Sequence, residues 1–239
     1  MLFDLKGKRR RAVQGTYLAL AVLMGVGLVA FGIGSGVNGG LSDLFSGGNG
    51  SNQGDKIIQK KIDTAQKQLQ VNPKNAAALA AVIRGHYQLA TTQSDPNTGQ
   101  FTSGARNDLG EAAAAWERYL ATNPKKPDLS LARVMIQGYS GLAQLTTERT
   151  AATRYWGGAA TATELIAADK PTPNNYIALV QYATLAGQTS KADLAGQKAV
   201  SLAPKKQRKS IQQQVAAAKA AGQSQAGGGA ASGGTGSAP

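Results

Sequence analysis

The sequence predicts an all-α protein in which one membrane-spanning helix near the N-terminus precedes a single helical domain. Three observations favour this fold class. Residues 12–42 form a run of 31 positions without a formal charge, directly after a basic cluster. Aromatic residues make up only 5% of a chain rich in alanine, which suits closely packed helices better than strands. Across residues 55–220, apolar residues recur at helical spacing, with prolines between the segments.

The uncharged run is long enough to cross a bilayer. Its apolar centre, 17–33, reaches about 20 residues with its small neighbours, which is the length of a helix that spans the hydrocarbon. Five cations precede it, whereas only Asp43 and Asp55 are charged in the linking stretch that follows, and this bias places the N-terminus in the cytoplasm. We therefore expect a cytoplasmic basic segment, 1–11, a transmembrane helix, 12–36, in the cell membrane, and an extracytoplasmic remainder.

Two further interpretations of this segment stay open. A cleaved signal peptide has a similar start, but its apolar core is usually about 7 to 15 residues long and ends at an A-x-A-like site, whereas residues 31–40 read FGIGSGVNGG. The pairs Ala21/Gly25 and Gly32/Gly36 would let two membrane helices approach closely, although glycine is common in such helices in any case.

Two polar segments frame the predicted domain. Residues 37–54 are rich in glycine, serine and asparagine, and residues 221–239 in glycine, alanine and serine. Neither contains enough apolar surface to pack, so we expect a flexible linker and a disordered tail. The intervening residues, 55–220, suffice for one helical domain with a sizeable core.

The chain is basic and lacks cysteine. Its formal net charge is +13; the segment through Arg11 supplies five cations minus Asp4, and Asp43 subtracts one, which leaves +10 after Gly54. Such a domain favours anionic partners, namely lipid headgroups, envelope polymers or acidic protein segments, unless the charge merely maintains solubility. The absence of cysteine excludes disulfides, thiolate zinc sites and thiol catalysis.

The first part of the domain predicts three helices and an insertion. An apolar stripe over 55–72 ends at a proline, and Asn75 can cap a second helix that continues to about residue 90. Residues 91–106 (TTQSDPNTGQFTSGAR) are rich in turn formers, which predicts an insertion. Asn107 can cap a third helix, which ends at the next proline.

The second part predicts five more helices. Two long ones, 128–146 and 148–168, are rich in alanine and glycine. The chain resumes as a helix after Pro173 and stops at Gly187, and Ser190 starts the next helix with a relative of the capping box. The last helix carries an apolar stripe of three residues, namely Ile211, Val215 and Ala218.

The ends of these helices repeat. The strings VNPKN, TNPKK and LAPKK surround Pro73, Pro124 and Pro204, where equivalent helices close. The last unit places apolar and small residues at fixed positions, namely Tyr176, Leu179, Val180 and Ala183 in its first helix, and Ala192 and Gly196 in its second. These residues and spacings resemble the tetratricopeptide repeat, a helix-turn-helix unit of about 34 residues with the pattern W-x-x-L-G-x-x-Y, A-x-x-x-F and P.

The resemblance implies a short α-solenoid of about three helical pairs with capping helices. Each pair needs a neighbour to bury its apolar face, and the end units present a polar outer side. Successive prolines at 73, 124, 171 and 204 lie 51, 47 and 33 residues apart, so the last unit alone has the standard length, and the insertion splits the first. A generic helical bundle is the alternative architecture.

No pattern in the sequence indicates catalysis. A hydrolase or transferase needs a nucleophile beside a base, or two carboxylates with separated pKa values, and the sequence presents no such constellation. His86, the single histidine, sits on an apolar helical stripe and is expected to be a packed core residue rather than a base or a ligand. Trp116 and Trp156 are expected to fill the core rather than a ligand pocket. We therefore expect no enzymatic activity, no cofactor and no metal site.

Two groups of residues are candidate partner contacts. In the family that the repeat resembles, first helices line the ligand groove, which implicates residues off the apolar stripes of those helices. They are Arg84, Tyr87, Asn174 and Gln181. The clearest basic cluster lacks interleaved aromatic residues for base stacking, so an anionic lipid or polymer is a better partner for it than nucleic acid. It consists of Lys205, Lys206, Arg208 and Lys209.

The sequence therefore predicts a single-pass membrane protein that displays a tetratricopeptide-like protein-interaction module outside the membrane. Resemblance to bacterial inner-membrane proteins of this layout implies a scaffold or chaperone-like helper that binds a protein partner or an exported polypeptide through a helical groove. The alternative is envelope attachment, in which the basic domain holds an anionic polymer or lipid.

Overall fold

The computed structural model describes residues 51–227, with side chains for 54–225. Apart from one isolated β-bridge, the regular structure in this range is helical, so the all-α prediction is confirmed. Predictions for residues 1–50 and 228–239, including the basic segment and the transmembrane helix 12–36, lie outside the described residues. None of the described helices is long and apolar enough to cross a membrane. They are α3 (Ser51–Val71), α4 (Ala76–Thr92), α5 (Arg106–Ala121), α6 (Leu129–Leu145), α7 (Arg149–Asp169), α8 (Pro173–Leu185), α9 (Thr189–Leu202) and α10 (Arg208–Gly227), with short 3₁₀ turns at Ser103–Ala105 and Lys205–Gln207.

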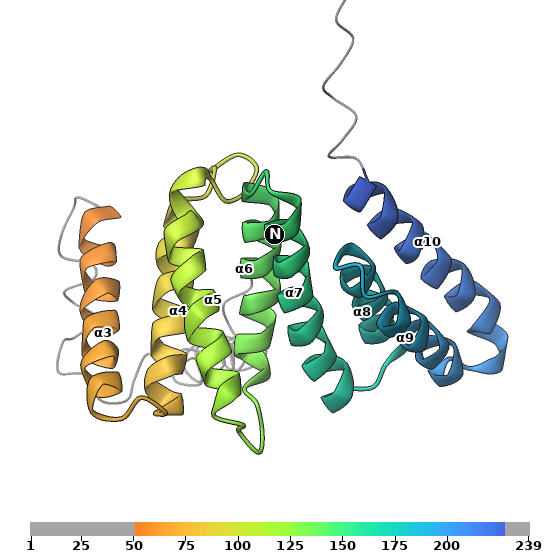
Figure 1. Cartoon of the computed structure of the whole chain (residues 1–239), viewed down its shortest axis with the longest axis horizontal. Helices are drawn as coiled ribbons and strands as arrows, with labels where there is room; N and C mark the ends of the chain where they lie inside the picture. Colours follow the sequence, from red (N-terminus) through yellow and green to blue (C-terminus); the bar gives the residue numbers. More distant parts are fainter. Residues whose placement is uncertain (1–50, 228–239) are drawn as a thin grey trace, which may run out of the picture. The chain divides into compact units, whose positions relative to one another are not determined.

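Each described helix packs on the next one in the chain, from α3 to α10 (Figure 1). The most extensive contacts join α6 with α7, α4 with α5, and α8 with α9. Two contacts skip one helix: α4 also packs on α6, and α10 on α8. The described domain is therefore a series of helical hairpins stacked in chain order, with α3 and α10 at its two ends.

Side-chain caps start three of the described helices, namely α4, α6 and α8, the last through Thr172. As predicted, the Asn75 side chain accepts a hydrogen bond from the backbone N–H of Ala78 (3.1 Å) at the start of α4. The Asp128 carboxylate accepts one from the backbone N–H of Ser130 (2.8 Å) at the start of α6. Asn107, the predicted cap of α5, lies inside that helix instead, because a 3₁₀ turn leads directly into it and Ala105 is the N-cap. Side-chain caps satisfy backbone N–H groups that a helix leaves without partners.

The helical region is longer than predicted at both ends. Helix α3 begins at Ser51, inside the expected linker 37–54, and α10 continues to Gly227, past the expected start of the tail at residue 221. Packing explains the second difference. Gly222 is buried, and a Cβ built on it would lie 2.8 Å from Cβ of Thr184, so the missing side chain allows α10 to approach α8 closely. From composition alone, Gly222 is predicted to belong to the glycine-rich tail.

Two clusters of buried side chains form the core. The larger one joins α3 to α7 and contains Trp116, whose side chain is 1% exposed and stacks on Tyr119 at 5.4 Å between ring centroids. The smaller one joins α8, α9 and α10 through residues such as Val180 and Val215. Trp156 packs at the edge of the larger cluster and stacks on Tyr182 of α8 at 6.1 Å. Large aromatic side chains thus fill spaces between alanine-rich helices, as expected for Trp116.

The insertion between α4 and α5 folds back onto the helices. A bridge pairs Ser94 with Phe101, and backbone N–H groups of Thr98 and Asn97 donate to the Asp95 carboxylate. These hydrogen bonds lower the pKa of Asp95. The Phe101 ring packs where a Cβ on Gly141 of α6 would lie, 2.5 Å from its nearest ring atom. The insertion therefore anchors one aromatic side chain against α6 rather than projecting freely.

Candidate functional site

The predicted groove residue Arg84 bridges α4 to the start of α6. Its Nη2 donates to Oδ2 of Asp128 (2.6 Å) and to Oγ of Ser130 (3.1 Å). Both charged side chains are partly exposed, 48% for Arg84 and 37% for Asp128, so the pair contributes at most about 1 kcal/mol. Partial burial acts to raise the pKa of Asp128, but hydrogen bonds from Ser130 and the charge of Arg84 outweigh it and hold that pKa below its usual value.

Tyr87 makes a second link between the same two helices. Its hydroxyl donates to Oε1 of Gln137, and its ring meets Phe101 edge to face at 6.0 Å between centroids. Burial raises the pKa of Tyr87, so the phenol stays neutral at physiological pH. Arg84 and Tyr87 therefore hold α4 against α6; as partner contacts they remain a prediction.

The other two groove candidates belong to a different helix. Asn174 and Gln181 are exposed side chains of α8, which packs on α7, α9 and α10. They lie two turns apart on one helix, while Arg84 and Tyr87 contact α6. The four predicted groove residues therefore form two separate pairs: Arg84 and Tyr87 on α4, and Asn174 and Gln181 on α8.

The basic cluster lies where the chain enters α10. Lys205 and Lys206 belong to the 3₁₀ turn, and Arg208 and Lys209 are the first two residues of α10; all four are exposed. Nε of Arg208 donates to the backbone oxygen of Ala203 (3.4 Å), which links its guanidinium group to the C-cap of α9. Among the described residues, none of the four cations pairs with a carboxylate.

The charge of the domain is concentrated in its last two helices. Residues 189–227 hold seven cations and one carboxylate, Asp193. Two of the cations are paired: Nζ of Lys191 lies 2.6 Å from the carboxylate of Glu164, and Nζ of Lys219 lies 2.5 Å from that of Asp193. The other five meet no carboxylate among the described residues, namely Lys198, Lys205, Lys206, Arg208 and Lys209.

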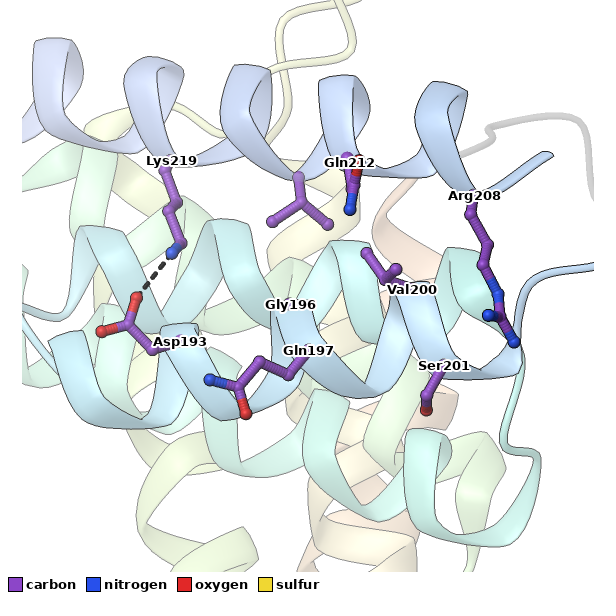
Figure 2. Close-up of a pocket in the computed structure, with 9 residues that line it drawn as sticks. Asp193, Gly196, Gln197, Val200, Ser201, Arg208, Gln212 and Lys219 are labelled. Carbon is purple, nitrogen blue, oxygen red and sulfur yellow. Dashed lines mark hydrogen bonds and ion pairs between the residues drawn. The ribbon is translucent and has the colours of Figure 1, made fainter. Parts of the chain in front are cut away.

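A cavity of about 560 Å³ opens between α9 and α10 (Figure 2). The Asp193–Lys219 ion pair lies at one end and Arg208 at the other, with Gly196, Val200 and Gln212 between them. Gly196 brings the two helices together, because a Cβ built there would lie 2.8 Å from Cγ1 of Val215. The result is a trough with an apolar floor, a neutralised end and a cationic end.

The sequence alone did not reveal this trough. Its lining comes from turns of two helices whose separation depends on Gly196, a residue that stands where the repeat pattern A-x-x-x-F has phenylalanine. The signal that was present is the basic cluster, of which Arg208 lines the cavity. The exposed Leu194, 67% accessible, lies on the same face of α9 as Ser201 and adds apolar surface beside it.

The single histidine is buried, as expected, but its partner was not foreseen. His86 is 8% exposed, and its Nδ1 lies 2.8 Å from Oδ1 of Asp108 on α5. Nε2 of Gln93 donates to the other carboxylate oxygen (2.8 Å), whereas Nε2 of His86 is buried and has no hydrogen-bond partner among the described residues. In a neutral imidazole the proton then lies on Nδ1, because a carboxylate only accepts. This network joins α4 to α5 and ties Gln93, at the start of the insertion, to both helices.

Within residues 54–225, no three histidine or acidic side chains gather in a way that could hold a metal ion. No protein-family model, curated protein or solved structure matches this chain.

Proposed function

We propose that this chain is a single-pass, membrane-anchored protein-interaction module of the tetratricopeptide type. It acts as a scaffold or chaperone-like helper at the extracytoplasmic face of the cell membrane. In this proposal α4–α5, α6–α7 and α8–α9 are the three helical pairs, and α3 and α10 are the capping helices.

One observation carries the proposal: helices stack in chain order, and α4 packs on α6 and α8 on α10. The α4–α6 contact joins the first helices of two successive pairs, as in a helical solenoid, where each pair covers the apolar face of its neighbour. The third pair joins this stack through the contact of α7 with α8, and α8 packs in turn on the capping helix α10. A closed bundle would instead bring the first helix against the last ones. Among the described helices, α3 makes its extensive contacts with α4. This arrangement favours the solenoid over the generic bundle.

Crosslinking in living cells tests the interaction function. A photoreactive amino acid is placed at Asn174 or Gln181 in the full chain, and at Gln66 on the exposed side of α3 as the matched control. We expect defined polypeptide adducts from the α8 positions, identified by mass spectrometry, and none from Gln66. Equal labelling from all three positions would contradict a binding surface on the first helices.

The membrane topology has its own test, because the chain has no native cysteine. Single cysteines at Gln66 and at Lys8 are treated with a membrane-impermeant maleimide in intact cells. An extracytoplasmic domain predicts labelling at Gln66, and labelling at Lys8 after permeabilisation alone. Labelling at Lys8 in intact cells would reverse the proposed orientation, and loss of the Lys8 cysteine from the mature chain would indicate cleavage.

Envelope attachment is the second candidate, and the unpaired cations of α9 and α10 favour it. Binding to an anionic polymer or lipid would depend on charge alone and weaken steeply as salt rises. Sedimentation of the full chain with polyphosphate at two salt concentrations measures this. Strong, salt-sensitive binding without any polypeptide adduct would favour attachment over the interaction module.

A further inference from the structure

The trough between α9 and α10 has the dimensions of a docking site for a helix. Its two ends, Arg208 and Lys219, are eleven residues apart on α10, which corresponds to roughly 16 Å or three helical turns. Val200 is half-buried at the floor together with Val215 of α10, and the exposed Leu194 lies at the edge of the trough, on the same face of α9 as the lining residue Ser201. An amphipathic helix binds such a groove through apolar side chains on successive turns.

The charge around the trough is uneven along its length. At one end Asp193 neutralises Lys219 (2.5 Å), whereas Arg208 and its neighbours Lys205, Lys206 and Lys209 have no carboxylate partner among the described residues. The N-terminus of α10 adds the positive end of the helix dipole at the same place. An occupant is therefore attracted most strongly if its carboxylates lie over the start of α10.

Neither segment outside the described residues has the composition of such an occupant. Residues 228–239 read GGAASGGTGSAP, without an acidic or large apolar side chain, and residues 1–50 hold five cations against two carboxylates. A second copy would bring two surfaces of the same positive sign together, which is repulsive. The charge complement must come from another polypeptide.

We propose that the trough between α9 and α10 binds an acidic amphipathic helix of a partner protein, an inference that rests on the proposed interaction function. The partner's apolar side chains lie over Val200 and beside Leu194, and its carboxylates face Arg208 and Lys209. This surface is separate from the first-helix residues Asn174 and Gln181. The apolar floor argues against a polyanion as the occupant, because a polyanion has no apolar groups to bury there. The concave form of the trough argues against a contact with a flat membrane.

The test uses the full chain in zwitterionic nanodiscs and a designed fluorescent peptide of 14 residues. The peptide carries leucines on one helical face and glutamates on both flanks; a second peptide replaces every glutamate with lysine, and empty nanodiscs give the background. We expect the acidic peptide to bind with at least about tenfold higher affinity than the lysine peptide, because close interfacial charge pairs of the right sign favour binding and those of the wrong sign oppose it.

Three variants localise the binding. Arg208→Gln/Lys209→Gln is expected to weaken the acidic peptide about tenfold, while the matched Lys60→Gln/Lys61→Gln on exposed α3 leaves it unchanged. Gln197→Trp fills the trough and weakens binding, with Gln66→Trp as its control. Asp193→Asn releases Lys219 and is expected to strengthen binding a few-fold, an effect that loss of structure would not produce. Far-UV circular dichroism confirms that each variant is folded.

The outcomes separate this inference from the proposed function. Binding of the acidic peptide that responds to Lys60→Gln/Lys61→Gln as much as to the α10 variant would overturn the trough and leave an interaction module that binds elsewhere. Failure of both peptides, together with the absence of adducts at Asn174 and Gln181, would overturn the interaction function itself. Recovery of binding only on phosphatidylglycerol vesicles, lost in Arg208→Gln/Lys209→Gln, would assign the cations to lipid and also overturn the inference.

Discussion

Two adjacent glycines of α7 provide a sharp test of how α6 and α7 pack. A Cβ built on Gly158 would lie 2.6, 2.7 and 2.8 Å from three ring atoms of Tyr139, whose side chain is 4% exposed. A Cβ on Gly157 would lie 3.4 Å from Nε2 of Gln188, which is an ordinary contact. Both substitutions replace a glycine of α7 with alanine. They differ only in the atoms that the new methyl group contacts.

The expected magnitudes follow from two opposing effects. Alanine is about 1 kcal/mol more favourable than glycine inside a helix, and both variants gain this. Inserting a methyl group against a buried ring costs about 1 to 3 kcal/mol, because the ring or the helix must move. Gly157→Ala should therefore stabilise the domain by up to about 1 kcal/mol, whereas Gly158→Ala should be neutral or destabilising by up to about 2 kcal/mol.

Urea unfolding of the full chain, followed by far-UV circular dichroism, measures both free energies. In thermal unfolding, each kcal/mol corresponds to a shift in Tm of about 2 to 4 °C for a domain of this size. Tyr139→Leu removes the ring atoms that the new methyl group meets, so in that background Gly158→Ala should lose its penalty. If Gly158→Ala is as stable as Gly157→Ala, the close packing of α7 on the Tyr139 ring is refuted.

Three further predictions concern Asp128 and Tyr139. Asp128→Ala should cost about 1 to 2 kcal/mol in the same titration, because it removes the N-cap of α6 and the partner of Arg84, whereas Arg84→Ala should cost at most about 1 kcal/mol. Burial opposes the lowered pKa of Asp128, but hydrogen bonds from Ser130 and the Arg84 charge dominate. Its contribution to stability is therefore complete above about pH 4 and falls as the pH drops toward the lowered value, so Asp128→Asn should flatten the acid limb of the stability profile. Burial, followed by the Glu117 carboxylate, raises the pKa of Tyr139; its contribution is complete below about pH 10 and falls as the pH rises from there, so Tyr139→Phe should flatten the alkaline limb.

The positions of the helices could be predicted because their signals are local. Periodic apolar residues, prolines and the cap at Asn75 all act within one or two turns, and each described helix lies close to its expected range. The ends of the domain were harder to place. Gly222 contributes to packing because it has no side chain next to Thr184. The two residues are 38 positions apart, and no local sequence pattern predicts a contact between them.

The candidate site shows the same limit. A helical wheel identifies Arg84 as lying off the apolar stripe, but it cannot show that Asp128, 44 residues later, starts the neighbouring helix within bonding distance. The trough is less predictable still, because it exists only where Gly196 lets α10 approach α9. The Lys and Arg cluster could be found from the sequence, while the apolar floor that makes it part of a groove could not.

At Arg208 and Lys209, the first two residues of α10, a substitution can distinguish a role in stability from a role in binding. Ile211 and Val215 bury the inner face of the helix, so the exposed Arg208 and Lys209 add little to packing. Cations at a helix N-terminus oppose the macrodipole by about 0.3 to 1 kcal/mol each, and a carboxylate there would be favourable. Lys209→Glu should therefore stabilise the domain in the urea titration and at the same time weaken binding of the acidic peptide. If the positive charge of Lys209 stabilised the fold, Lys209→Glu would destabilise the domain. A variant that is more stable but binds the peptide more weakly is expected if Lys209 is retained for binding rather than for stability.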